Sequence, residues 1–135
     1  MDAFTGDGIP THLLTREAIQ IYLQRLANTG IMLFHISNRY YNLAPIIIAT
    51  SLKLGLHCVK SPELLKTPIE WSKPSLCVAV SREKETIRPL IESGWVHIEN
   101  GNFKESNIEP WTDDYINVLT PLILKFGSLR DLSHF

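Results

Sequence analysis

The sequence predicts an α/β domain that contains the tail of a doubly wound sheet, mostly parallel and ending in one reversed strand. Segments with apolar residues at helical spacing alternate with short apolar runs, which is the pattern of a parallel sheet covered by helices. One of these runs, residues 31–36, is apolar almost throughout, as expected of a strand covered on both faces. The link over residues 61–74 contains three prolines and no helical pattern. We therefore expect the strands that it joins to be antiparallel neighbours.

Composition and charge fit one small soluble domain. The 135 residues are 44% hydrophobic and 20% charged, and the 13 basic and 14 acidic side chains form no run of either sign. This pattern lacks the basic footprint of proteins that bind nucleic acids or acidic membranes. No apolar stretch approaches the ~18 residues of a membrane span, and no secretory signal is recognisable. Cys58 and Cys77 lack metal-type spacing, so we expect buried free thiols in a cytoplasmic protein.

The first helix has clear start and stop signals. Thr15 is predicted to cap a helix over residues 16–27. Leu14 and Ile19 have the spacing of a hydrophobic staple across that cap, and Gly30 lies where the chain must leave the helix. Its buried stripe is predicted from residues at helical spacing: Ile19, Tyr22, Leu23 and Leu26.

The remaining elements continue the alternation. Asn42 is predicted to cap a second helix, which tolerates Pro45 in its first turn and ends at Gly55. After it we expect two strands, a helix that ends before Gly94, a short edge strand, and a last helix that Thr112 caps. The predicted bounds of these later elements are 56–59, 76–80, 83–93, 95–98 and from 112 onward.

Several short stretches in a fixed order carry a family resemblance. They are Asp2-Ala3-Phe4, Ile9-Pro10, Leu14-Thr15-Arg16-Glu17-Ala18, Phe34-His35-Ile36-Ser37-Asn38-Arg39-Tyr40 and Trp111-Thr112-Asp113-Asp114-Tyr115. The series resembles the second half of a spermidine synthase-like protein, a polyamine aminopropyltransferase. Within that family it is most similar to the bacterial branch that is often fused to a transporter-like membrane region. The resemblance extends over residues 2–120.

The resemblance implies a truncated Rossmann-like fold, that of the methyltransferases that use S-adenosylmethionine. Their sheet has seven strands, and the last strand is antiparallel. Residues 1–135 would then form a single partial α/β domain, the C-terminal half of that fold. By the same resemblance, the strand over 31–36 is the fifth strand, and the strands over 56–59 and 76–80 are the final hairpin. The other implied parts are a remnant of the fourth strand (1–3), the active-site loop (4–15) and a C-terminal helical segment (111–135).

The resemblance also implies the chemistry and its residues. Spermidine synthases move an aminopropyl group from decarboxylated S-adenosylmethionine to an amine, which must lose a proton to a carboxylate before it attacks carbon. Asp2 would be that catalytic carboxylate, and Asp7 would be a second one on a loop that closes over the substrates. His35 and Tyr40 would bind substrate, although His35 stands where a glutamine is usual, which leaves the acceptor open. Asp7 as a turn residue, His35 as a core histidine and Tyr40 as rim packing are the structural alternatives.

The glycine-rich loop that would bind the co-substrate is not in this sequence. The family holds the nucleoside with that loop after the first strand and an acidic residue after the second, whereas this chain has only the lone Gly6-Asp7-Gly8. We therefore expect no cofactor to bind to this chain alone, and decarboxylated S-adenosylmethionine to bind only to the complete family domain. No metal is expected, because the five histidines form no H-E-x-x-H pattern and no cluster with cysteine.

Two functions of different classes compete, and a third stays open. The chain is the C-terminal portion of a spermidine synthase-like transferase that is inactive in isolation, or a non-catalytic truncated domain that binds a partner or its own copies. The third is part of a methyltransferase of unknown substrate. The strand over 31–36 loses most of its neighbour when the fourth strand shrinks to residues 1–3. We therefore expect a homo-oligomer or pairing with the missing N-terminal half, with a polyamine as the substrate of the complete enzyme.

Overall fold

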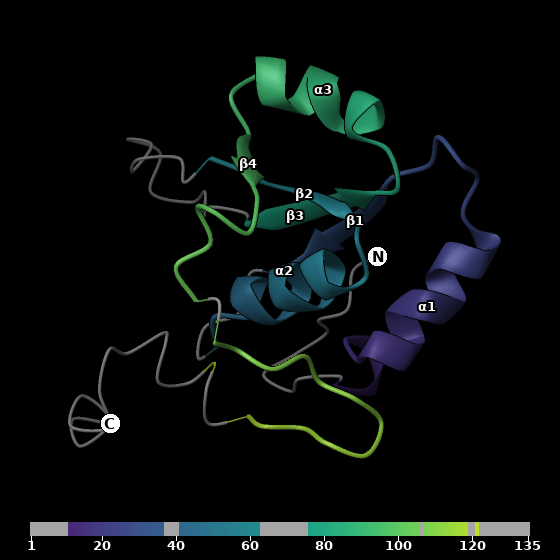
Figure 1. The fold of residues 1–135 in the computed structure, drawn as a ribbon, viewed down its shortest axis with the longest axis vertical. Coiled ribbons are helices and arrows are strands. Elements are labelled where there is room, and N and C mark those ends of the chain that lie inside the picture. Colours follow the sequence, from purple (N-terminus) through teal and green to yellow (C-terminus); the bar gives the residue numbers. More distant parts are fainter. Residues whose placement is uncertain (1–10, 37–40, 63–75, 106, 119–120, 122–135) are drawn as a thin grey trace, which may run out of the picture.

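The computed structural model describes residues 11–36, 41–62, 76–105, 107–118 and 121, and it confirms an α/β fold. A four-stranded sheet lies between helices (Figure 1). In chain order the elements are the 3-10 helix η1 (Thr11–Leu13), α1 (Arg16–Arg25), β1 (Met32–His35), α2 (Ala44–Lys53), β2 (His57–Lys60), β3 (Cys77–Ser81), α3 (Lys84–Glu92) and β4 (Val96–Ile98).

The strands lie in the order β1-β3-β2-β4, and every neighbouring pair is antiparallel. Val80 on β3 pairs with Met32 on one side and with Cys58 on the other, so β1 and β2 run in the same direction with β3 between them. The prediction that β2 and β3 are antiparallel neighbours is confirmed, and so is the short edge strand β4. The prediction of a mostly parallel sheet is wrong for these strands. The helix between β1 and β2 indicates their common direction, but β3 is inserted between them and reverses every contact.

The two faces of the sheet pack against different helices. α2 contacts β2 and β3 on one face, and α3 contacts the same two strands on the other (Figure 1). Successive residues of a strand point to opposite faces, so Cys58 joins the larger core cluster with α2, whereas Val59 joins Ala79 and Ile87 beside α3. α1 lies on the α2 side of the sheet, because its Ile19 belongs to the larger cluster.

β1 is buried on one face only. Met32 and Phe34 are 8% and 2% exposed in the larger core cluster, whereas Leu33 between them is 46% exposed. Ile31, just before the strand, is 39% exposed. The expectation that residues 31–36 are covered on both faces is therefore wrong for Ile31 and Leu33. The helix on that face, α3, packs against β2 and β3.

The start of α1 agrees with the prediction. Oγ1 of Thr15 accepts a hydrogen bond from the backbone N–H of Ala18 at 3.2 Å, which satisfies one of the free donors of the first turn. Leu14 and Ile19 are both fully buried on either side of this cap. They form the predicted hydrophobic staple, which sets the direction in which the chain enters the helix.

The end of α1 binds the side chain of Arg82, the residue that directly follows β3. The helix ends at Arg25, before the predicted residue 27, and Leu26 has extended dihedral angles. The guanidinium of Arg82 donates to the carbonyl oxygen of Leu26 at 2.8 Å and also to that of Leu23. A cation that binds the last carbonyl groups of a helix satisfies free acceptors and the helix dipole together.

α2 is the most buried helix, and residues 44–51 are all buried. The prediction that Asn42 caps it is wrong, because the N-cap is Leu43 and no side chain caps the first turn. Leu43 is fully buried, so core packing and not a side-chain hydrogen bond places this helix start. Pro45 lies in the first turn as predicted, where it interrupts no intrahelical hydrogen bond.

Glycines end α2 and α3 at the predicted places. Gly55 and Gly94 have φ angles of 74° and 106°, which residues with a Cβ rarely adopt. Beyond Gly94, the N–H of Trp95 donates to the carbonyl oxygen of Leu90 at 3.0 Å. This is a Schellman arrangement, which satisfies carbonyl groups that the helix end leaves free.

The prediction of a helix that starts at Thr112 is wrong over residues 112–118. Thr112 and Tyr115 exchange two backbone hydrogen bonds of 2.9 and 3.1 Å, which close a tight turn. Trp111 is fully buried and anchors the segment. The Asp113 carboxylate accepts a hydrogen bond from Oγ1 of Thr15. Apart from residue 121, the rest of the predicted C-terminal helical segment lies outside the described residues.

Candidate functional site

Of the residues predicted for the site, the structure describes His35. Asp2, Asp7 and Tyr40 lie outside the described residues, as do the predicted remnant of the fourth strand and most of the loop after it. His35 is the last residue of β1 and lies opposite Cys77 on β3, half-buried. It therefore lies at the carboxyl end of the strand, while its grouping with the other three residues stays a prediction.

The link from β1 to α2 contains a buried acceptor atom. Oδ1 of Asn42 is buried and accepts no hydrogen bond from any residue that the structure describes. The backbone at this position is held, because the N–H of Asn42 donates to the carbonyl oxygen of Pro121 at 3.1 Å. A buried acceptor without a donor costs about 1–3 kcal/mol, so this position suits a ligand that donates a hydrogen bond. Sequence reasoning missed this role, because an Asn before an apolar helix is an ordinary cap signal.

The two cysteines are free thiols, and the prediction that they are buried is confirmed for Cys58 but not for Cys77. Cys58 is fully buried in the larger core cluster, and burial raises the pKa of its thiol to about 12. Cys77 is only partly buried, and burial raises the pKa of its thiol as well. Because the reactive form of cysteine is the thiolate, burial makes both side chains weaker nucleophiles than an exposed cysteine.

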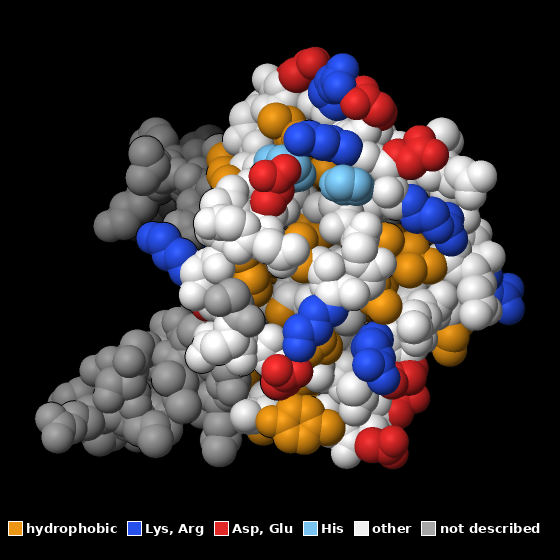
Figure 2. All heavy atoms as spheres, viewed as in Figure 1, with side chains coloured by type: hydrophobic (Ala, Val, Ile, Leu, Met, Phe, Trp, Pro, Cys, Tyr) orange, Lys and Arg blue, Asp and Glu red, His pale blue; other side chains and the backbone are white. Residues whose placement is uncertain are grey.

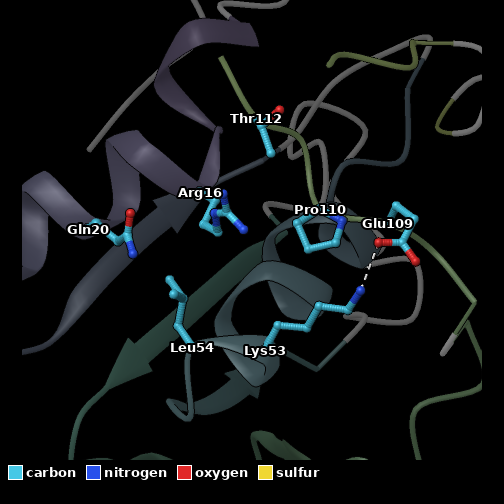
Figure 3. A pocket seen from close by; sticks show the side chains of 7 residues that line it. All are labelled: Arg16, Gln20, Lys53, Leu54, Glu109, Pro110 and Thr112. Atoms are coloured by element: carbon cyan, nitrogen blue, oxygen red, sulfur yellow. Dashed lines mark hydrogen bonds and ion pairs between the residues drawn. The ribbon is translucent and has the colours of Figure 1, made fainter. Parts of the chain in front are cut away.

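A groove of about 430 Å³ opens between α1 and the last turn of α2 (Figure 3). One wall comes from α1, the facing wall from the end of α2, and a third side from the segment over residues 109–112. No sequence motif predicts the groove, because distant parts of the chain form it. The residues that line it are Arg16, Gln20, Lys53, Leu54, Glu109, Pro110 and Thr112.

Three hydrogen bonds and one buried ring fix the 109–112 side of the groove to α1. The carbonyl oxygen of Trp111, whose side chain is fully buried, accepts a hydrogen bond from the N–H of Arg16 at 2.7 Å. Oγ1 of Thr15 donates to Oδ1 of Asp113 at 2.8 Å, and the N–H of Asp113 donates to Oε2 of Glu17 at 3.0 Å. Hydrogen bonds from backbone N–H groups, first its own and then that of Asp113, hold the pKa of Glu17 below its usual value.

The charges around the groove are arranged in exposed pairs. Nζ of Lys53 lies 2.8 Å from Oε2 of Glu109 across the groove, and Nη2 of Arg16 lies 3.2 Å from Oε1 of Glu17. Both cationic side chains are 50% exposed, so each pair is worth about 0–1 kcal/mol. On the face shown in Figure 2, basic and acidic side chains are mixed without a large patch of one sign. The groove itself is lined by two cations and one carboxylate.

A pair of histidines lies on β2 and β4, at the edge of the sheet opposite β1. The ring centroids of His57 and His97 are 6.5 Å apart, and Nδ1 of His97 lies 3.4 Å from Oε1 of Glu99. Among the described residues, however, no three His, Cys, Asp or Glu side chains are close enough to hold a metal ion.

The comparisons with known proteins identify no relative of this chain. No family model, no curated protein and no solved structure matches it. Within the described part of the chain, every helix is too short or too polar to cross a membrane.

Proposed function

We propose that this chain is the C-terminal portion of a spermidine synthase-like transferase, which works only together with the half of the domain that binds the co-substrate. The observation that carries the proposal is the direction of the strands. β1 and β2 run the same way, and β3, the later partner of both, runs against them. A late strand that runs against its neighbours is the feature that the resemblance implies for the methyltransferase-type sheet. β3 has this direction, as does the edge strand β4 that follows it, and α2 and α3 pack on opposite faces of β2 and β3.

The buried acceptor atom of Asn42 supports a polyamine as the substrate. Open α/β sheets build their sites at the carboxyl ends of the strands; His35 lies at that end of β1, and Asn42 directly precedes the N-cap of α2, the helix that follows this strand. A protonated amine would donate to the buried Oδ1 of Asn42 and remove the cost of leaving that atom unsatisfied. By resemblance, Asp2 accepts the proton that the attacking amine loses, Asp7 lies on the loop that closes over the substrates, and Tyr40 binds the substrate.

The proposal includes a partner for the exposed apolar side chains near β1. Ile31 and Leu33 are 39% and 46% exposed beside a sheet face that is otherwise covered by α3. Either the N-terminal half of the family domain or a second copy of this chain would bury them. The free thiols agree with the reducing cytoplasm, the compartment that we propose for the protein.

Nucleoside binding tests the proposal in two parts. Titration calorimetry with decarboxylated S-adenosylmethionine should show no micromolar binding to the isolated chain, because no glycine-rich loop is present to hold it. A fusion that places the glycine-rich half of a spermidine synthase-like protein before Met1 should restore binding. It should also transfer an aminopropyl group to putrescine or spermidine.

The alternatives give different results in the same fusion. A methylated product from S-adenosylmethionine would favour the methyltransferase. A folded fusion without any transfer, together with self-association of the isolated chain in sedimentation experiments, would favour the non-catalytic module and contradict the proposed function.

A further inference from the structure

We propose that the groove between α1 and α2 binds the phosphate group of a small phosphorylated molecule. The groove shares no residue with the proposed transfer site, so this second site goes beyond the proposed function and does not depend on it. Its volume of about 430 Å³ leaves room for more than a phosphate group alone.

Donor groups approach the groove from two helices. Arg16 comes from α1 and Lys53 comes from the facing end of α2, whereas the hydroxyl of Thr112, on the segment that closes the groove, points away from the other lining side chains (Figure 3). Gln20 lies one turn further along α1, beside Arg16. A tetrahedral phosphate can accept hydrogen bonds in several directions at once, whereas a carboxylate accepts them in one plane. Donors from two facing helices therefore favour phosphate.

The cations keep donors available for a ligand. The guanidinium of Arg16 has five N–H donors, and its Nη2 donates to Oε1 of Glu17. The ammonium of Lys53 has three donors and binds Glu109 through one of them. Glu17 stays engaged with the N–H of Asp113, outside the groove lining.

Glu109 is the group that a phosphate must displace. Its side chain is 69% exposed, and its pair with the half-exposed Lys53 is worth about 0–1 kcal/mol, so its displacement costs little. A phosphate with close to two negative charges between two cations gains more than this single exposed contact. Leu54 and Pro110 provide an apolar surface for the remainder of the ligand.

The site is organised before a ligand arrives. The hydrogen bonds that tie residues 111–113 to the start of α1 fix the position of Thr112 relative to Arg16. The turn between Thr112 and Tyr115 holds the same residue from its other side. Binding therefore needs no ordering of this wall, which would otherwise reduce the affinity.

The test is a titration of the ¹⁵N-labelled full chain with inorganic phosphate and with a phosphomonoester at low ionic strength. We expect the amide signals of Arg16, Gln20, Lys53 and Thr112 to shift together with one dissociation constant. Arg16→Gln and Lys53→Gln should each weaken the affinity roughly tenfold, because each removes a charged donor. Glu109→Gln should strengthen it by about two- to fivefold, because it removes the competing carboxylate.

The matched control removes a positive charge elsewhere. Arg88 lies on α3, and its side chain is 58% exposed. Arg88→Gln should leave the affinity unchanged. The proposal is overturned if Arg88→Gln and Arg16→Gln have equal effects, if Glu109→Gln weakens binding, or if succinate binds as tightly as phosphate. None of these outcomes bears on aminopropyl transfer, so the two proposals fail independently.

Discussion

Replacing Thr15 by valine tests how the C-terminal part of the described structure is joined to α1. The Oγ1 atom of Thr15 accepts from Ala18 N–H at 3.2 Å and donates to the Asp113 carboxylate at 2.8 Å. The side chain is fully buried, so valine fills the same space and removes only the hydroxyl. The substitution therefore measures two hydrogen bonds without the complication of a cavity.

The expected loss of stability is the sum of these two contacts. Loss of an N-cap hydroxyl costs about 1 kcal/mol. A hydrogen bond to a carboxylate is worth about 1.5–3 kcal/mol when it is protected from water. Because Asp113 is exposed, we reduce its share to about 1 kcal/mol. Thr15→Val should then lower the free energy of unfolding by about 2 kcal/mol, which corresponds to roughly 8 °C in Tm at this chain length.

Urea unfolding followed by circular dichroism gives the number, and a double-mutant cycle separates the two contacts. Thr15→Ser keeps the hydroxyl and should cost much less than Thr15→Val. Asp113→Ala should destabilise the wild-type chain by about 1 kcal/mol and have almost no effect in the Thr15→Val background. If Asp113→Ala costs the same in both backgrounds, the hydrogen bond between Thr15 and Asp113 does not stabilise the fold, and one of the three bonds that fix the third wall of the groove is absent.

Three further substitutions or conditions test other parts of the fold. Arg82→Gln should cost about 1–2 kcal/mol in urea unfolding, because the last carbonyl groups of α1 lose their charged donor; a loss below about 0.3 kcal/mol would contradict this role. Gly94→Ala should lower the free energy of unfolding by about 1 kcal/mol, because the φ angle of 106° is strained for a residue with a Cβ. Gly101→Ala is the control, because a Cβ at this position meets open space. The pKa of Cys58 is raised from 9.0 to about 12 in the folded state, so its contribution to stability is present below pH 9 and is lost as the pH rises toward 12. Cys58→Ala should therefore make stability fall less steeply above pH 9, and an unchanged slope would show that this thiol is not protected by burial.

Local signals in the sequence predicted element ends well where nothing distant competes for the same atoms. Thr15 caps α1 as predicted, and Gly55 and Gly94 end α2 and α3. Thr112 carries the same type of cap signal, yet residues 113–118 form a turn and extended chain and not a helix. The difference lies in tertiary contacts, because Asp113 is already engaged with the start of α1. A cap pattern does not reveal which of its polar atoms another element will use.

The order of the strands is less predictable than their direction. A helix between β1 and β2 indicates that these strands run in parallel, and they do. That β3 would enter between them depends on contacts such as Met32 with Val80, which are distant in the sequence and leave no local periodicity. The groove has the same property, because Arg16, Lys53 and Glu109 come together only through the packing of α1, α2 and the segment after β4.

The most direct test of the central claim is the rate of aminopropyl transfer in the reconstituted domain. This rate is compared between the fusion protein that contains Asp2 and its Asp2→Asn variant. The fusion with a glycine-rich N-terminal half should convert putrescine or spermidine into its aminopropylated product, which mass spectrometry identifies. Asp2→Asn should lower the rate on the order of 10²-fold or more while decarboxylated S-adenosylmethionine still binds, because the amide cannot accept the proton that the amine must lose. A fusion that binds the nucleoside but forms the product equally fast with asparagine at this position would contradict the proposed function.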